Sequence, residues 1–117
     1  MDFNEILAAT YAGIDIINIS WFSGCSFSQY EQDVITEAYQ NGSFIIAAAG
    51  NGNTCGSASD MVFPASYATV FSVTSIGKYD NHEDVIGDPN TTHQHNPRVD
   101  LSAPGYQVGI SPSSNHY

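Results

Sequence analysis

Apolar residues near the N-terminus recur first at helical and then at strand spacing. A short helix is predicted over residues 5–12, with Asp2 or Asn4 as its N-cap and Gly13 just past its C-terminal end. The residues of this helix expected to face inward are Ile6, Leu7 and Ala9. Residues 14–20 are dense in isoleucine, so they predict a strand.

A second helix and a second strand follow. Ser28 and Glu31 have the spacing of a capping box, in which each side chain accepts a hydrogen bond from the other residue's backbone N–H. This spacing predicts a helix that starts at Ser28 and ends at Gly42. Its expected apolar face comprises Tyr30, Val34, Ile35 and Ala38. The order strand, helix, strand within roughly thirty residues predicts a βαβ unit with parallel strands and a right-handed crossover.

Residues 44–53 carry the most distinctive pattern in the chain. Their apolar start, Phe-Ile-Ile at 44–46, predicts a buried strand, and the alanines that follow are too small to fill space. Gly50 and Gly52 then flank Asn51, whose amide carries two donors and one acceptor oxygen. One interpretation is an Asn-Gly turn after a buried strand. The other is a rigidly held hydrogen-bond donor that the sheet delivers to a cleft.

The predicted parallel pairing has a consequence for where these segments lie. Neighbouring parallel strands end at the same edge of a sheet, and open α/β sheets bind their ligands at that carboxyl edge. The segment Ser20-Trp21-Phe22 follows the first strand, and Ala48-Ala49-Gly50-Asn51 follows the second. We therefore expect the two segments to lie side by side.

The second half of the chain is predicted to add two strands. Residues 68–76 alternate and are β-branched, and residues 98–102 form a short strand that Ala-Pro-Gly at 103–105 stops. Phe63-Pro64 is a predicted corner before the first of these strands. Residues 77–97 are polar and without periodicity, which is typical of a functional or mobile loop.

Composition narrows the classes of function. The 117 residues suffice for one domain with a core but not for two. Two basic residues against twelve acidic ones give a net charge of −10, which argues against nucleic acid and anionic membrane surfaces as partners, because phosphate binding needs clustered Lys and Arg. No apolar run approaches the length of a membrane span, and residues 1–5 lack a signal-peptide pattern. A targeting segment of an exported parent protein would therefore lie outside this chain.

Four short motifs follow one another in order. They are Ile16-Ile17-Asn18-Ile19-Ser20, Ala47-Ala48-Ala49-Gly50-Asn51, Phe63-Pro64-Ala65-Ser66-Tyr67 with Val70 and Val73 after it, and Val99-Asp100-Leu101-Ser102-Ala103-Pro104-Gly105. Together, over residues 6–108, they resemble the middle of a subtilisin-like serine protease (subtilase) domain. The resemblance implies an α/β fold, the three-layer α/β/α subtilisin-like fold with a parallel sheet. Residues 1–117 would be its central part and would lack both flanks.

The resemblance also implies roles for individual residues. Asn51 corresponds to the side-chain donor of the oxyanion hole, which stabilises the charge that develops on a peptide carbonyl under attack. Ala48, Ala49 and Gly50 would form one wall of the pocket for the residue before the scissile bond. Ser20-Trp21-Phe22 would pair with the substrate backbone as an added strand, although Phe22 stands where the family usually has glycine. The Phe63-Pro64 peptide bond is expected to be cis.

The function implied is that of a serine endopeptidase that acts on polypeptides through a Ser-His-Asp triad. Neither the Asp nor the His motif of the family occurs before Ile14, and no Gly-Thr-Ser occurs anywhere. We expect the triad to come from the remaining parts of the same protease domain. The chain alone should then be inactive, and its unpaired strand edges should make it marginally stable or prone to aggregation.

Two alternatives to this function stay open. The first is a truncated, non-catalytic product of a subtilase that serves as a binding or structural module. The second is an unrelated doubly wound ligand-binding domain, which would need a phosphate-binding glycine loop that the sequence does not contain. The family resemblance implies a secreted or extracytoplasmic protein.

Cysteine, histidine and acidic residues suggest further sites. Cys25 and Cys55 follow strands that end at the same edge, so in an exported protein they could form a disulfide across the pocket floor. His93 and His95 would suit a metal pair, but no third ligand lies at short spacing, and a solvated loop is preferred. The acidic residues of the long loop are Asp80, Glu83, Asp84 and Asp88. They would suit structural Ca²⁺, but a solvated acidic face is preferred, and no cofactor is predicted.

Overall fold

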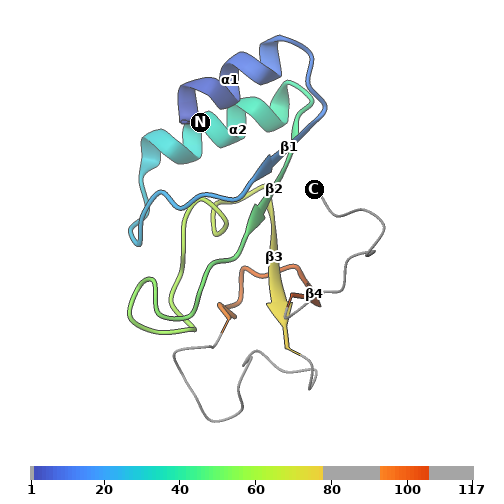
Figure 1. Cartoon of the computed structure of the whole chain (residues 1–117). Coiled ribbons are helices and arrows are strands. Elements are labelled where there is room, and N and C mark those ends of the chain that lie inside the picture. Colours follow the sequence, from blue (N-terminus) through green and yellow to red (C-terminus); the bar gives the residue numbers. More distant parts are fainter. Residues whose placement is uncertain (1, 78–92, 106–117) are drawn as a thin grey trace, which may run out of the picture.

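The computed structural model describes residues 2–77 and 93–105. Its elements in chain order are α1 (Phe3–Tyr11), β1 (Ile16–Ile19), α2 (Gln29–Gln40), β2 (Phe44–Ala48), β3 (Val70–Ile76) and β4 (Leu101–Pro104). The strands form a parallel sheet in the order β1-β2-β3-β4, so each strand pairs with the one before it in sequence (Figure 1). The predicted parallel α/β fold is confirmed. Neither helix described in these two ranges has the length and apolar character of a membrane span.

One face of the sheet is covered by the two helices, which lie side by side (Figure 1). In β1 and β2, alternate residues point to this face and are buried, as Ile17 pairs with Ile45 and Ile19 pairs with Ala47. The residues of the hydrophobic core are Phe3, Ile6, Ile17, Ile19, Val34, Ile35, Ala38, Ile45, Ala47, Phe63, Ala65, Tyr67 and Val70. The core therefore lies between the sheet, the helices and the corner that begins at Phe63.

The opposite face of the sheet is open in the part of the chain that the structure describes. Ile16, Phe44 and Leu101 lie on it and are 63%, 42% and 52% exposed. The expectation that residues 44–46 form a fully buried strand is therefore wrong for Phe44, and Ile46 is only half-buried. The described residues supply one helical layer and the sheet, and the second helical layer of the expected three-layer arrangement is not among them.

The start of α1 forms a complete capping box, although the sequence pattern predicted only a cap at Asp2 or Asn4. Asp2 is the N-cap, and its Oδ1 accepts a hydrogen bond of 3.0 Å from the Glu5 N–H. The Glu5 carboxylate in turn accepts one of 3.2 Å from the Asp2 N–H. Both exchanges satisfy donors that a helix start leaves without intrahelical partners.

The start of α2 corrects the predicted capping box. Ser28 is the N-cap, as predicted, and its Oγ accepts from the Glu31 N–H at 3.5 Å. The Glu31 carboxylate does not return to Ser28. It accepts from the Tyr67 hydroxyl at 2.6 Å and from the Ser23 hydroxyl at 3.1 Å, while the Ser28 N–H donates to the Tyr67 oxygen at 3.1 Å. A tertiary partner has replaced the local one, which ties α2 to the corner after Phe63.

Three further expectations are settled by the structure. Tyr30 does not join the buried face of α2, because it is 59% exposed and its hydroxyl donates to Asn4 on α1. The fourth strand starts and ends later than predicted, at Leu101 and Pro104, so Ala103 and Pro104 belong to it and do not stop it. Before it, Val99 closes a turn by donating its N–H to the Asn96 carbonyl. The Phe63-Pro64 peptide bond is cis, as expected. The acidic residues Asp80, Glu83, Asp84 and Asp88 lie outside the described residues.

Candidate functional site

The carboxyl ends of β1 and β2 enclose a small cavity of about 160 Å³. Its lining residues are Ser20, Trp21, Phe22, Ala48, Gly50, Asn51, Thr54 and Val62. The structure thus brings the segment after β1 and the segment after β2 together around one space, as parallel pairing requires. Of the site residues predicted from the sequence in these two segments, Ala49 is the one outside this lining. It is buried and lines a second, larger cavity instead.

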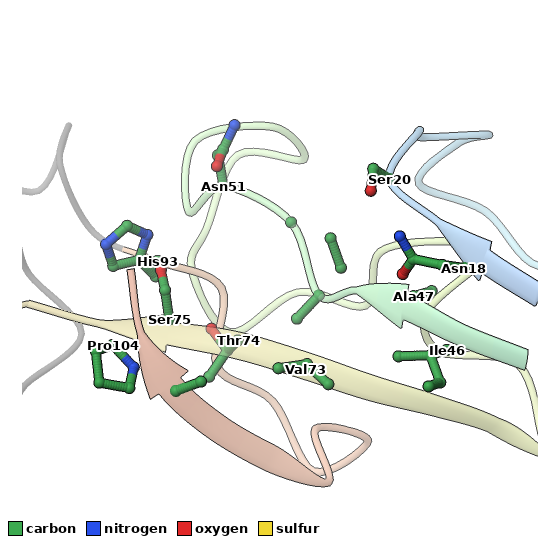
Figure 2. Close-up of a pocket in the computed structure, with 14 residues that line it drawn as sticks. Asn18, Ser20, Ile46, Ala47, Asn51, Val73, Thr74, Ser75, His93 and Pro104 are labelled. Carbon is green, nitrogen blue, oxygen red and sulfur yellow. The ribbon is translucent and has the colours of Figure 1, made fainter. Parts of the chain in front are cut away.

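A second cavity of about 400 Å³ adjoins the first on the open face of the sheet. Its lining residues are Asn18, Ser20, Ile46, Ala47, Ala48, Ala49, Gly50, Asn51, Val73, Thr74, Ser75, His93, Ala103 and Pro104. Figure 2 shows Asn51 and Ser20 on separate loops above the strands that line it. The two cavities share Ser20, Ala48, Gly50 and Asn51, so these residues stand where the cavities meet.

Asn51 combines a fixed backbone with an unengaged side chain. Its carbonyl accepts from the Thr54 N–H at 3.0 Å, so the Asn-Gly turn that the sequence suggests is present. Asn51 also forms an antiparallel bridge with His93, and the Gln94 N–H donates to the carbonyl of the preceding residue, Gly50. The exposed amide of Asn51 makes no hydrogen bond with any residue in the described ranges. Its two N–H donors are therefore available to a ligand.

Gly50 has a conformation that requires glycine. Its φ angle is +111°, in the region that side chains with a Cβ rarely adopt. A Cβ at this position would also lie 3.0 Å from Cγ1 of Val62. The positive φ angle and the close packing against Val62 therefore explain why the residue directly before Asn51 is a glycine.

Residues 51–60 are hydrogen-bonded to residues 93–96, a contact that the sequence pattern did not predict. Gln94 is fully buried, and its side-chain Nε2 donates to the backbone carbonyls of Ser57 and Asp60. The backbone carbonyl of Gln94 accepts from the Thr74 hydroxyl. The His95 N–H donates to the Ala58 carbonyl. The expected solvated loop is therefore wrong for this segment. The only signal was the alternation His-Gln-His, which places Gln94 on the side opposite its neighbours.

The histidines do not assemble a metal site in the described part of the chain. His93 and His95 are both half-buried, and His93 lines the larger cavity. The Nδ1 of His95 lies 2.9 Å from the His93 carbonyl oxygen. No group of three or more His, Cys, Asp or Glu side chains that could hold a metal ion occurs among residues 2–77 and 93–105.

Residues 20–28 form the other wall of the small cavity. Ser23 donates its N–H to the Phe63 carbonyl at 2.8 Å, and the Phe63 N–H donates to the Gly24 carbonyl at 3.0 Å. Trp21 packs edge-on against Phe3 with ring centroids 5.3 Å apart, and its buried indole N–H has no partner in the described ranges. Phe22 is 50% exposed and lines the mouth of the cavity.

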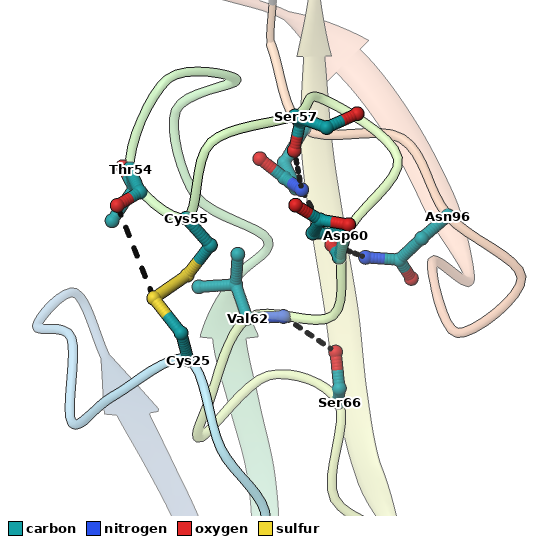
Figure 3. Close-up of a disulfide and its surroundings, with 9 residues drawn as sticks. Cys25, Thr54, Cys55, Ser57, Asp60, Val62, Ser66 and Asn96 are labelled. Atoms are coloured by element: carbon teal, nitrogen blue, oxygen red, sulfur yellow. Dashed lines mark hydrogen bonds between the residues drawn. A yellow bond between two sulfur atoms is a disulfide. The ribbon is translucent and has the colours of Figure 1, made fainter.

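A disulfide joins Cys25 to Cys55, with the two Cα atoms 5.6 Å apart (Figure 3). The Thr54 carbonyl oxygen lies 3.9 Å from the Cys25 sulfur. Because that sulfur carries no hydrogen in a disulfide, this is a packing contact and not a hydrogen bond. The covalent bond thus connects the loop after β1 to the loop after β2.

Charged side chains are scarce in the described lining of the two cavities. No charged side chain is among the residues that line the smaller cavity, and in the larger one His93 is the one titratable lining residue that the structure describes. Behind this edge, burial raises the pKa of Tyr67, and its hydrogen bond to Glu31 raises that pKa further. The neutral phenol is therefore the form that holds α2 to the corner.

Comparison with known proteins gives consistent matches. The family model described as the subtilase family matches residues 2–117. Subtilisin DY of Bacillus licheniformis is 31% identical over 109 residues, which is 93% of this chain and 37% of that protein. The minor extracellular protease Epr of Bacillus subtilis (strain 168) is 28% identical over 104 residues, or 89% of this chain and 14% of the relative.

Among solved structures, the psychrophilic subtilisin-like protease Apa1 from the Antarctic psychrotroph Pseudoalteromonas sp. AS-11 matches with a TM-score of 0.70 and 26% identity. The match covers 90% of this chain and 22% of that structure. The chain thus spans little more than a third, or less, of the proteins that it resembles.

Proposed function

Because the chain belongs to the subtilase family, we propose that it forms the oxyanion-binding and substrate-binding part of a serine endopeptidase active site. The observation that carries the proposal is Asn51, whose amide is unengaged while its backbone is fixed at the junction of two cavities. A donor held in this way needs no reorganisation when charge develops beside it.

The chemistry explains why an amide is suited to this position. Attack on a peptide carbonyl places negative charge on its oxygen, and a prepositioned neutral donor stabilises that charge. A carboxylate would repel the oxygen. A lysine would lose the rotamer freedom of a long side chain when it was held in place.

The substrate would bind along residues 20–22. β1 lies at the edge of the described sheet, so the segment that continues from it has backbone groups with which an extended peptide can pair. The side chain of the residue before the scissile bond would enter the small cavity, with Ala48 and Gly50 on one wall. Ala49, which the sequence also predicts for this wall, lines the larger cavity beside it. The neutral lining of that cavity favours an apolar side chain.

The nucleophile, the base and its carboxylate partner would come from the remaining parts of the same domain. We place those parts on the open face of the sheet, where apolar side chains are exposed beside the larger cavity. Acyl transfer by a Ser-His-Asp triad would then use Asn51 as one of its oxyanion donors. Secretion is part of the proposal, supported by the disulfide and by a relative whose name describes it as extracellular.

The test uses a complete protease domain in which residues 2–117 of this chain replace the matching segment of subtilisin DY. Asn51 is then replaced by alanine in this hybrid protein. We expect kcat to fall by about 100- to 1,000-fold, which is the loss that removal of the corresponding donor causes in subtilisin itself. KM should change little, because the donor acts mainly in the transition state. Asn53→Ala is the matched control, since Asn53 is exposed and lines neither cavity. An unchanged kcat in Asn51→Ala would refute the proposed role.

A further inference from the structure

The two walls of the small cavity are not hydrogen-bonded to each other. Residues 20–28 carry Trp21 and Phe22, and residues 49–60 carry Asn51 and Thr54. Both segments lie within the described ranges, and no hydrogen bond connects one to the other. The covalent link between them is the disulfide of Cys25 and Cys55.

Each wall is fastened on its far side to a different part of the molecule. The first wall is held to the corner through the backbone pairing of residues 23 and 24 with Phe63. The second wall is held to residues 93–96, chiefly through the buried Gln94. The walls also continue from the paired strands β1 and β2, which fix the inner end of the gap. Loss of the disulfide would therefore let the outer part of the gap widen without detaching either wall.

The size of the gap matters because the cavity is small. Its volume of about 160 Å³ is close to that of an engineered apolar cavity, of roughly 150 Å³, that accommodates one benzene ring. One six-membered ring or a branched aliphatic side chain therefore fits. The larger fused rings of an indole fit less readily.

We propose that the Cys25–Cys55 disulfide sets the width of this cavity and thereby determines which substrate side chains it accepts. The inference rests on the function proposed above and adds a selectivity to it. With the disulfide intact, the cavity prefers a single apolar ring or a branched aliphatic side chain before the scissile bond. Without the disulfide, the loop that carries Trp21 and Phe22 moves outward and the cavity accepts tryptophan more readily.

The disulfide is accessible to a chemical test, because Cys25 is exposed and Cys55 is half-buried. Dithiothreitol transfers two electrons and two protons, so the S–S bond breaks, both sulfurs become thiols and the reagent closes to its cyclic disulfide. Diiodomethane then joins the two thiolates through one CH₂ group and releases two iodide ions. This methylene-bridged form keeps a covalent link between the two residues but lengthens it. It therefore tests the effect of a wider cavity in a protein that still has the stabilisation of a cross-link.

The experiment uses the complete protease domain described above and peptide substrates that differ only in Trp or Phe before the scissile bond. We expect the ratio of kcat/KM for Trp to that for Phe to rise by about tenfold in both the reduced and the methylene-bridged forms, the scale on which apolar pockets sense one methylene. Thr10→Val is the matched control, because it removes the buried hydrogen bond from Ser43 to Thr10, far from the cavity. It should lower stability and leave the ratio unchanged.

The outcomes separate this inference from the proposed function. Hydrolysis with the same Trp-to-Phe ratio in the oxidised, reduced and bridged forms overturns the role of the disulfide alone. An equal change of ratio in Thr10→Val also overturns it, since the effect would then follow stability. Absence of hydrolysis in the oxidised form overturns the proposed function, and the selectivity with it.

As an independent readout, Trp21 is the only tryptophan of the chain and lines the cavity. In the isolated chain, reduction should increase quenching of its fluorescence by acrylamide, and the methylene bridge should do so as well. Quenching that stays the same in both forms contradicts the outward movement of the loop.

Discussion

The two faces of the sheet differ in what they contribute to the molecule, and β2 shows the difference within two adjacent residues. Ile45 points to the helices and is 1% exposed, while Phe44 points the other way and is 42% exposed. The covered face gathers the hydrophobic core and the buried polar contacts. The open face carries the larger cavity. Stability is therefore concentrated on one side of the sheet, and the candidate chemistry lies at the edge and on the other side.

Replacing each of these two neighbours by alanine tests the contrast most strongly. Ile45→Ala removes a fully packed side chain and should lower the free energy of unfolding by about 3 kcal/mol. Phe44→Ala removes a larger but exposed side chain whose ring contacts that of Phe71, and should cost less than about 1 kcal/mol. Urea denaturation followed by circular dichroism measures both. Equal losses would mean that the open face is covered in the folded protein.

A polar contact on the covered side should have the next largest effect. Tyr67→Phe removes the hydroxyl that donates to Glu31 and accepts from the Ser28 N–H, so it should cost about 2 kcal/mol. The same variant has a signature in pH. Because burial and Glu31 raise the pKa of Tyr67 in the folded state, its stabilising effect is complete below the ordinary tyrosine pKa of 10.0 and is lost as pH rises above that value.

The alkaline limb of the stability curve should therefore flatten in Tyr67→Phe. Tyr11→Phe is the control, since Tyr11 also donates to a carboxylate, that of Glu37, but lies exposed on the surface. Its effect on stability and on the alkaline limb should be smaller. If the free energy of unfolding of Tyr67→Phe fell above pH 10 as steeply as that of the wild type, ionisation of the Tyr67 phenol would not be the cause of the alkaline loss of stability.

The open face itself should respond least in stability and most in association. Ile16→Thr combined with Leu101→Thr replaces two exposed apolar residues and should change the free energy of unfolding by less than about 0.5 kcal/mol. The isolated chain should nevertheless self-associate less, because exposed apolar surface drives association. Sedimentation velocity of the wild-type chain and the double variant at equal concentration measures this. Unchanged self-association would mean that another surface of the chain drives it.

The same contrast explains which features the sequence predicts well. Both helices, the parallel pairing and the meeting of residues 20–22 with residues 48–51 follow from local periodicity, caps and the geometry of parallel strands. Asn51 illustrates how two interpretations can both hold. Its backbone forms the turn that the Asn-Gly pair predicts, and its side chain still stands at the cavities.

The errors arise where a distant residue outcompetes a local partner. Glu31 has the spacing to cap its own helix, but Tyr67, thirty-six residues later, takes its carboxylate. Gln94 resembles a loop residue because polar side chains are mostly exposed, yet it is buried where it can satisfy carbonyls of residues 57 and 60. Phe44 is apolar and still exposed, because hydrophobic character does not reveal which face of a sheet the described residues cover.

The strand order also bears on how the chain assembles during synthesis. Because the described strands pair in the order in which they are made, β2, β3 and β4 each find a neighbour that has already been synthesised. Ribosomes add about 5–20 residues per second, so each strand has on the order of a second to dock before the next emerges. The nascent sheet can thus grow outward from β1, with one edge advancing as the polypeptide lengthens.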